Sequence, residues 1–251
     1  MQRKALIAAN WKMHTTSASA RKLAEDVAKT WNGGEDREVL LAPPFTVLKE
    51  VASALAGTDI ILAGQNVCWE EQGAYTGEIS PTMLKDSGAT AAIIGHSERR
   101  QLFGEDDAMI NKRLRGALAF DLLPILCCGE TLTERENGKT FNVLETQIRQ
   151  ALADVAQADI ASVVIAYEPV WAIGTGKTAT TEQAQEAHGF LRRLIEKLYK
   201  KNIAEQMRIL YGGSVKPANV DELMQQTDID GALVGGAALD AESFGRIINF
   251  S

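Results

Sequence analysis

Short apolar runs alternate with longer amphipathic or charged stretches along the whole chain, and this pattern repeats eight times. The runs are rich in alanine and β-branched residues, and most of them end in glycine, asparagine, histidine, cysteine or glutamate. Continuous apolar runs of this length are typical of strands that are buried on both faces of a sheet. The pattern predicts strands at residues 5–10, 38–42, 60–66, 90–96, 122–128, 162–168, 208–213 and 231–236.

The stretches between the runs have the spacing of helices. Residues 17–31 and 181–201 carry apolar side chains three or four positions apart, which places them on one face of a helix. Pro217 suits the first turn of a helix after the seventh run. Asp240 suits the N-cap of a last helix, because its carboxylate can accept a hydrogen bond from a free backbone N–H.

Eight alternations of strand and helix predict an α/β fold with a parallel sheet and crossover helices. Two architectures are compatible with that order, a closed (β/α)8 barrel and an open, doubly wound sheet. A length of 251 residues is typical of the barrel, which we therefore favour. We expect a single domain over residues 1–251, since no linker or composition break interrupts the pattern. In either architecture, functional residues collect at the carboxyl ends of the strands.

Composition narrows the function classes. Hydrophobic residues make up 45% of the sequence and charged residues 24%, which is typical of a globular chain and excludes disorder as the main interpretation. The net charge of −7 disfavours nucleic acid or an anionic membrane as partner, but it allows a small anionic substrate in a locally positive site. No apolar stretch approaches the ~20 residues of a membrane helix. The three cysteines lack zinc or CxxC spacing, so we expect a reducing, cytoplasmic location.

The first and fourth runs end in polar side chains that could carry chemistry. Alternation along the first run places Asn10 and Lys12 on one face, so both would lie at the barrel mouth if that face points inward. The alternative is a lysine that turns into solvent. His96 ends the fourth run, immediately before a helix-compatible segment at 97–103. A helix N-terminus favours the neutral imidazole, which can donate a hydrogen bond and return a proton; the alternative is a structural histidine.

Glu168 ends the sixth apolar run, on the same strand face as Val164 and Ala166. A carboxylate in this place is the most unusual feature of the chain. We expect burial to raise its pKa and to make it a general base near neutral pH. The alternative is a glutamate that turns outward to pair with a basic residue.

The segment after Glu168 contains two apparent nucleotide motifs, and both fail. A P-loop that ends at residues 176–178 would need glycine at position 171, which is Trp171. Gly174 to Ala179 fits a loose dinucleotide fingerprint, but it does not lie at a strand-to-helix turn. Small residues after an apolar start favour a mobile lid over residues 171–176, with an ordinary surface loop as the alternative.

The last two runs both end in a glycine pair. Ser214 follows Gly212 and Gly213 after the seventh run, and Gly235 and Gly236 end the eighth. Glycine allows backbone N–H groups to approach an anion closely. One such pair alone is usually a tight turn. Two pairs at successive strand ends favour the phosphate site that many barrels form after strands seven and eight.

These features together resemble one family over the whole length of the chain, the triosephosphate isomerase family, whose fold is the (β/α)8 or TIM barrel. The segments that carry the resemblance are NWKM (10–13), QNV (65–67), GAYTGE (73–78), IGHSERR (94–100), CCGE (127–130), AYEPVWAIGTG (166–176), YGGSV (211–215) and VGGA (234–237). The resemblance implies reversible isomerisation of dihydroxyacetone phosphate and D-glyceraldehyde 3-phosphate through an enediolate, in glycolysis and gluconeogenesis. It implies neither a metal ion nor an organic cofactor.

The resemblance also implies roles for single residues. Glu168 abstracts the carbon-bound proton, neutral His96 polarises the carbonyl and moves protons between the oxygens, and Lys12 offsets the enediolate charge. Ser97 and Glu98 support Glu168 and Lys12, respectively. The residues implied to contact substrate are Asn10, Trp11, Lys12, Gly174, Ser214, Gly235 and Gly236.

The long segment 65–78 is a functional loop on length alone. The resemblance implies that it forms a homodimer contact, with Thr76 near Asn10 of the partner. Two other functions stay open on the residues themselves. A different phosphate-binding barrel, such as a sugar-phosphate lyase or synthase, would share the glycine pairs without needing Glu168 and His96. A non-catalytic barrel would bind phosphate without turnover.

Overall fold

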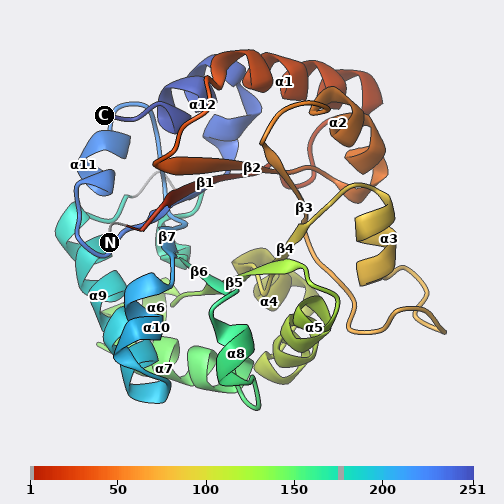
Figure 1. Cartoon of the computed structure of the whole chain (residues 1–251). Helices are drawn as coiled ribbons and strands as arrows, with labels where there is room; N and C mark the ends of the chain where they lie inside the picture. Colours follow the sequence, from red (N-terminus) through yellow and green to blue (C-terminus); the bar gives the residue numbers. More distant parts are fainter. Residues whose placement is uncertain (1–2, 175–177) are drawn as a thin grey trace.

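Eight parallel strands form a closed barrel in the computed structural model, which describes residues 3–174 and 178–251 (Figure 1). The strands follow chain order around the barrel, and β1 pairs with both β2 and β8. This closure confirms the predicted (β/α)8 barrel and excludes the open sheet. The strands are β1 (Ala5–Asn10), β2 (Arg37–Ala42), β3 (Ile61–Gly64), β4 (Ala91–Ile94), β5 (Leu123–Cys128), β6 (Val164–Tyr167), β7 (Ile209–Tyr211) and β8 (Gly231–Val234).

Helices surround the barrel on its outside (Figure 1). They are α1 (Ser17–Thr30), α2 (Leu48–Ala54), α3 (Pro81–Asp86), α4 (Ser97–Phe103), α5 (Asp107–Ala119), α6 (Leu132–Glu136), α7 (Thr140–Ala151), α8 (Gln157–Ile160), α9 (Thr181–Leu198), α10 (Lys201–Gln206), α11 (Val220–Met224) and α12 (Ala241–Ile248). The described part of the chain also contains three short 3-10 helices, η1 (Phe45–Val47), η2 (Val170–Ala172) and η3 (Gly236–Leu239). No helix in the described residues is long and apolar enough to cross a membrane.

Most differences from the sequence prediction lie at the ends of elements. Several strands stop before their last predicted residues; β4, for example, ends at Ile94, since Gly95 adopts a φ of +70° and turns the chain out of the sheet. The predicted helix 181–201 is two helices, because α9 ends at Leu198 and α10 begins at Lys201. Pro217 does not begin a helix. It lies in a turn, and α11 begins at Val220.

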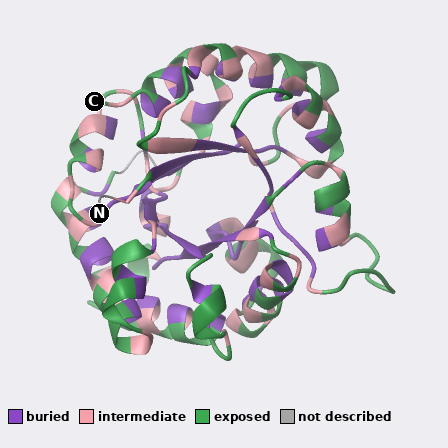
Figure 2. Ribbon diagram, in the orientation of Figure 1, coloured by how far each residue is buried: buried purple, intermediate pink, exposed green. Residues whose placement is uncertain are grey.

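The core has two layers, one inside the barrel and one between the barrel and the helices. The inner layer combines alanines, including Ala8, Ala63 and Ala166, with leucine and isoleucine side chains that fill the narrow interior. The outer layer contains the apolar faces of the helices. The strands are therefore buried on both faces while the helices expose their outer surfaces, as Figure 2 shows. This explains why the strands appear in the sequence as continuous apolar runs.

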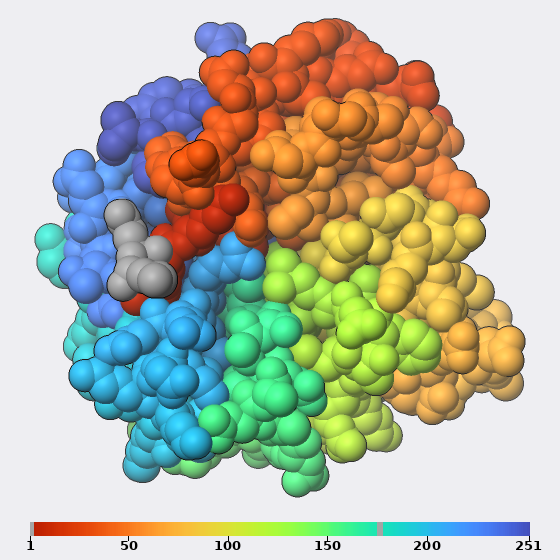
Figure 3. Space-filling view, viewed as in Figure 1, coloured from red at the N-terminus to blue at the C-terminus, as the bar shows by residue number. Residues whose placement is uncertain are grey.

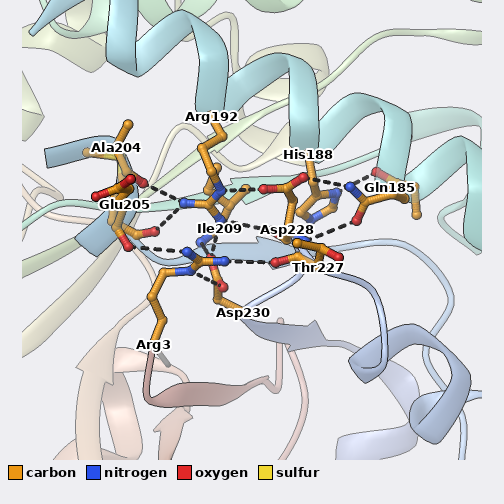
Figure 4. Close-up of polar contacts among 12 residues, drawn as sticks. Arg3, Gln185, His188, Arg192, Ala204, Glu205, Ile209, Thr227, Asp228 and Asp230 are labelled. Atoms are coloured by element: carbon orange, nitrogen blue, oxygen red, sulfur yellow. Dashed lines mark hydrogen bonds and ion pairs between the residues drawn. The ribbon is translucent and has the colours of Figure 1, made fainter. Parts of the chain in front are cut away.

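A partly buried cluster of ion pairs lies at the amino-terminal end of the barrel (Figure 4). Arg192 of α9 donates to Asp228 and, through Nη2, to Asp230 Oδ2 at 2.6 Å. Asp230 also pairs with Arg3 and accepts a 2.9 Å hydrogen bond from the backbone N–H of Ile209, the first residue of β7. The cluster joins the starts of β1, β7 and β8 to α9, and it leaves the carboxyl end of the barrel for the chemistry.

Candidate active site

Polar residues that follow β1, β4, β6, β7 and β8 converge on one cavity of about 260 Å³. Lys12, His96 and Glu168 line one part of it, and Gly174, Ser214 and the Gly235–Gly236 pair line another. Each residue comes directly after a strand or from the loop that follows one, and parallel strands bring those ends to the same rim of the barrel. The structure thus brings together most of the side chains that the sequence singled out.

Glu168 and His96 are in direct contact although they lie on different strand ends. Glu168 Oε1 is 2.9 Å from His96 Nε2, and Glu168 Oε2 accepts a 2.8 Å hydrogen bond from the backbone N–H of Ser97. The exposed fractions of Glu168 and His96 are only 2% and 5%. Burial raises the pKa of Glu168, but His96, the Ser97 amide and Lys12 together lower it by more. The expectation that burial sets this pKa was therefore wrong in direction, because the charge attraction of His96 and the hydrogen bonds to the carboxylate together outweigh desolvation.

His96 is the N-cap of α4, as the helix-compatible segment after it suggested. Its Nδ1 accepts a hydrogen bond from the backbone N–H of Glu98 at 3.2 Å, which assigns the ring hydrogen to Nε2. Burial lowers the pKa of His96, and the carboxylates of Glu168 and Glu98 together raise it by more. The ring thus experiences two opposing influences: Glu168 favours the imidazolium, whereas the Glu98 amide favours the imidazole.

Lys12 is held in a left-handed backbone conformation with a φ of 52°. Its backbone N–H donates to Asn10 Oδ1 at 3.0 Å, and its Nζ lies 2.6 Å from Glu98 Oε1. Gln65 donates through Nε2 to the Lys12 carbonyl at 2.8 Å and to that of Ala42 at 2.9 Å. Left-handed backbone is unusual for a lysine, so these contacts fix a conformation that would otherwise be unfavourable.

The loops after β6, β7 and β8 also line the cavity. The Lys12 side chain passes close to Gly235, where an added Cβ would lie 3.4 Å from Lys12 Cε. At the start of the predicted lid, the indole of Trp171 donates to Glu130 at 3.0 Å, and Tyr167 donates to the same oxygen. Of the predicted lid, residues 175 and 176 lie outside the described part of the chain.

Trp11 lies apart from the other predicted site residues. Its side chain is fully buried in the outer core layer and does not line the cavity.

Several residues close to the site were missed from sequence. A Cβ on Gly212 would lie 2.8 Å from Glu168 Cγ, and a Cβ on Gly129 would lie 1.7 Å from the Glu168 carbonyl oxygen, so both glycines allow the Glu168 strand end to be closely enclosed. Gln65 and Cys127 also adjoin site residues. In the sequence, we interpreted glycines at strand ends only as contacts for a phosphate group. We did not consider that they could leave space for Glu168. Among the described residues, no three or more His, Cys, Asp or Glu side chains are grouped to hold a metal ion.

A closed α/β barrel with a buried carboxylate–imidazole pair and glycine-rich loops at the carboxyl strand ends defines a barrel enzyme that acts on a small, anionic molecule. Comparison with known proteins identifies the group more narrowly. The chain belongs to the triosephosphate isomerase family, because the family model described as "Triosephosphate isomerase" matches residues 5–251.

Three similar relatives carry the same name, triosephosphate isomerase. The protein from Caldanaerobacter subterraneus subsp. tengcongensis is 55% identical over 248 residues, which cover 99% of this chain and 100% of the relative. The protein from Geobacter metallireducens is 55% identical over 245 residues, 98% of each chain. The protein from Citrifermentans bemidjiense is 54% identical over 249 residues, 99% of each chain.

Proposed function

We propose that this protein interconverts dihydroxyacetone phosphate and D-glyceraldehyde 3-phosphate, as an isomerase of glycolysis and gluconeogenesis. One observation carries the proposal. A carboxylate and an imidazole in mutual contact line one cavity together with glycine-rich loops suited to a phosphate. This combination suits aldose–ketose isomerisation through an enediolate, in which one proton leaves carbon while another is exchanged between neighbouring oxygens.

Glu168 is the general base. Its lowered pKa keeps the carboxylate ionised, and its position at the cavity wall lets it take the carbon-bound proton next to the carbonyl. The abstraction leaves an enediolate, and Glu168 returns the proton to the adjacent carbon. His96 polarises the carbonyl through the hydrogen on Nε2 and moves protons between the two substrate oxygens. The Glu98 amide supports this role, because it occupies Nδ1 and leaves Nε2 as the donor.

Lys12 and Asn10 offset the negative charge that develops on the enediolate oxygens, and the Lys12 ammonium also faces the phosphate. Glu98 holds that ammonium in place through the 2.6 Å contact. The Ser97 amide positions the Glu168 carboxylate before substrate binds. The buried indole of Trp11 anchors the segment that carries Asn10 and Lys12, and it does not itself contact the substrate.

Gly174, Ser214, Gly235 and Gly236 bind the phosphate group. The lid at residues 171–176 closes over it and excludes water, which strengthens every charge interaction inside the site. Closure also protects the enediolate, because this intermediate can lose phosphate as a side reaction. The loss is prevented while the bond between carbon and the phosphate ester oxygen is held in the plane of the double bond.

A coupled assay tests the activity. Purified protein is supplied with dihydroxyacetone phosphate, and formation of glyceraldehyde 3-phosphate is followed by a dehydrogenase, with Glu168→Gln as the matched control. We expect turnover by the parent chain and its near loss in the control. Binding of inorganic phosphate without turnover would instead identify a non-catalytic barrel.

We further propose a homodimer formed through the loop at residues 65–78, in the cytoplasm. The loop projects from the barrel beside α3 (Figure 1) and lies at the edge of the molecule in the space-filling view (Figure 3). Met13, Met83, Leu102 and Phe103 are exposed apolar side chains on the described surface, with Met13 exposed by 94%. Such exposure favours burial against a second copy. Sedimentation of the parent and of Thr76→Arg tests it: we expect a dimer that dissociates in the variant, and a monomeric parent would overturn the proposal.

A further inference from the structure

The side-chain amide of Gln147 binds both polar groups of Gly129. Gln147 Oε1 accepts a hydrogen bond from the Gly129 N–H at 2.8 Å, and Gln147 Nε2 donates to the Gly129 carbonyl at 3.1 Å. The glutamine lies on α7, which is anchored to the core through the buried side chains of Leu144 and Ile148. Strand β5 ends at Cys128, so Gly129 is the first residue beyond the strand. A side chain from a rigid helix therefore fixes the backbone where β5 ends.

Gly129 is in turn pressed against Glu168. A Cβ at position 129 would lie 1.7 Å from the Glu168 carbonyl oxygen, so the two backbones are in direct contact. The Glu168 N–H donates to the Cys128 carbonyl at 2.7 Å. On the other side, Gly212 encloses the Glu168 side chain near Cγ. A shift of Gly129 must therefore be transmitted to Glu168, since neither contact leaves space to absorb it.

We propose that Gln147 is a positioning residue for Glu168. It acts through Gly129, and the proposal rests on the proposed function of Glu168 as the base. Displacement of a reacting group by about 1 Å costs on the order of 100-fold in rate, so a partial displacement predicts a loss of about 10- to 100-fold in kcat. KM should change by about twofold or less, because the phosphate loops after β7 and β8 do not contact Gln147 and ground-state binding is kept.

A second cavity allows a direct test of the amide itself. Gln147 and Glu168 both line a pocket of about 110 Å³ together with Ser97, Gln101 and Thr131. A pocket of this size has the volume of about three or four waters. Gly129 already lines this pocket, and Gln147→Ala adds to it the space of the lost amide. Formamide has the acceptor and the donors that the variant lacks. We expect added formamide to restore part of the lost kcat.

The experiment compares Gln147→Leu and Gln147→Ala, each with and without formamide, in the coupled assay. Leucine keeps the approximate size of glutamine and removes both hydrogen bonds. Asn111→Leu is the matched control, because Asn111 Nδ2 also supports α7, through the carbonyls of Ala151 at 2.9 Å and Ala153 at 2.8 Å, away from Glu168. We expect the control to lower the melting temperature while kcat stays within about twofold of the parent.

The expected result is a kcat loss at position 147 with KM preserved and with formamide recovery confined to Gln147→Ala. If kcat of Gln147→Leu stays within about twofold of the parent, the positioning role is refuted. If the loss appears but formamide does not reverse it, or if Asn111→Leu shows the same loss, the effect comes from the packing of α7 and the proposal is overturned. Turnover by the parent protein separates the positioning role of Gln147 from the proposed isomerase function. If the parent shows no turnover, the proposed function itself is refuted.

Discussion

Shortening the Glu168 side chain tests the proposed base most directly. Glu168→Asp keeps the charge but withdraws the carboxylate by about 1.5 Å, the length of one carbon–carbon bond. In the parent structure, the carboxylate oxygens of Glu168 lie 2.9 Å from His96 Nε2 and 2.8 Å from the Ser97 N–H. The withdrawal in the variant therefore breaks both contacts. The distance to the reacting carbon increases in the same way, beyond the roughly 3–3.5 Å of a reactive approach.

The rate loss follows from this geometry. If 1 Å of misplacement costs about 100-fold, a withdrawal of about 1.5 Å costs roughly 100- to 1,000-fold in kcat, or about 2.7–4 kcal/mol of transition-state stabilisation. The chain should remain folded, although the buried Ser97 N–H loses its partner at a cost of about 1–3 kcal/mol in unfolding free energy. KM should change little, because the phosphate loops are unaffected.

The measurement is steady-state kinetics in both directions, with urea unfolding on the same samples. Glu186→Asp is the matched control, since it makes the same chemical change on the exposed face of α9. We expect the control to match the parent. A kcat for Glu168→Asp within about tenfold of the parent would refute the assignment, because a carboxylate that acts on carbon cannot tolerate this displacement.

Three further variants test other parts of the molecule. Lys12→Ala should raise KM and lower kcat together in steady-state kinetics, and unchanged affinity for a phosphate analogue would contradict its double role. Gly212→Ala should lower kcat by about tenfold with little change in KM, because its Cβ would lie 2.8 Å from Glu168 Cγ and displace the base. Burial raises the pKa of Asp228, but Gln185 and Arg192 lower it by more. The stability contributed by charged Asp228 is therefore present above about pH 4 and is lost as pH falls through the folded pKa. Asp228→Asn should lower the urea midpoint at pH 7 more than at pH 3, and an equal shift at both would argue against the ion pair.

The strands were predictable because burial on both faces makes each of them a continuous apolar run. Their ends were less predictable, because the polar residues that end each run belong to the site rather than to the sheet. His96 continues the apolar run of β4 in sequence, yet the structure makes it the N-cap of α4. Such errors fall where a residue is selected for chemistry instead of for its secondary structure.

The candidate site was predictable as a set of residues but not as a geometry. Glu168 stands out as a carboxylate after apolar residues, whereas nothing in the sequence indicates that it lies 2.9 Å from His96. Gln147 gave no signal at all, because a single amide on a helix is an ordinary surface residue, and Gln65 stood out only as part of the QNV segment and as the start of the long loop. Their roles depend on which carbonyl and N–H groups the barrel brings within reach.

The contact between Glu168 and His96 also indicates how the site changes when it acts. While the two are in contact, the carboxylate favours the imidazolium, and both of its oxygens are occupied, Oε1 by His96 and Oε2 by the Ser97 N–H. A substrate carbonyl that accepts the Nε2 hydrogen must replace Glu168 there. His96 then loses the contact that raises its pKa most, while burial and Lys12 still lower that pKa and the Glu98 amide still occupies Nδ1. In the proposed mechanism, the same exchange frees the carboxylate to face the carbon, so a single displacement prepares both the acid and the base.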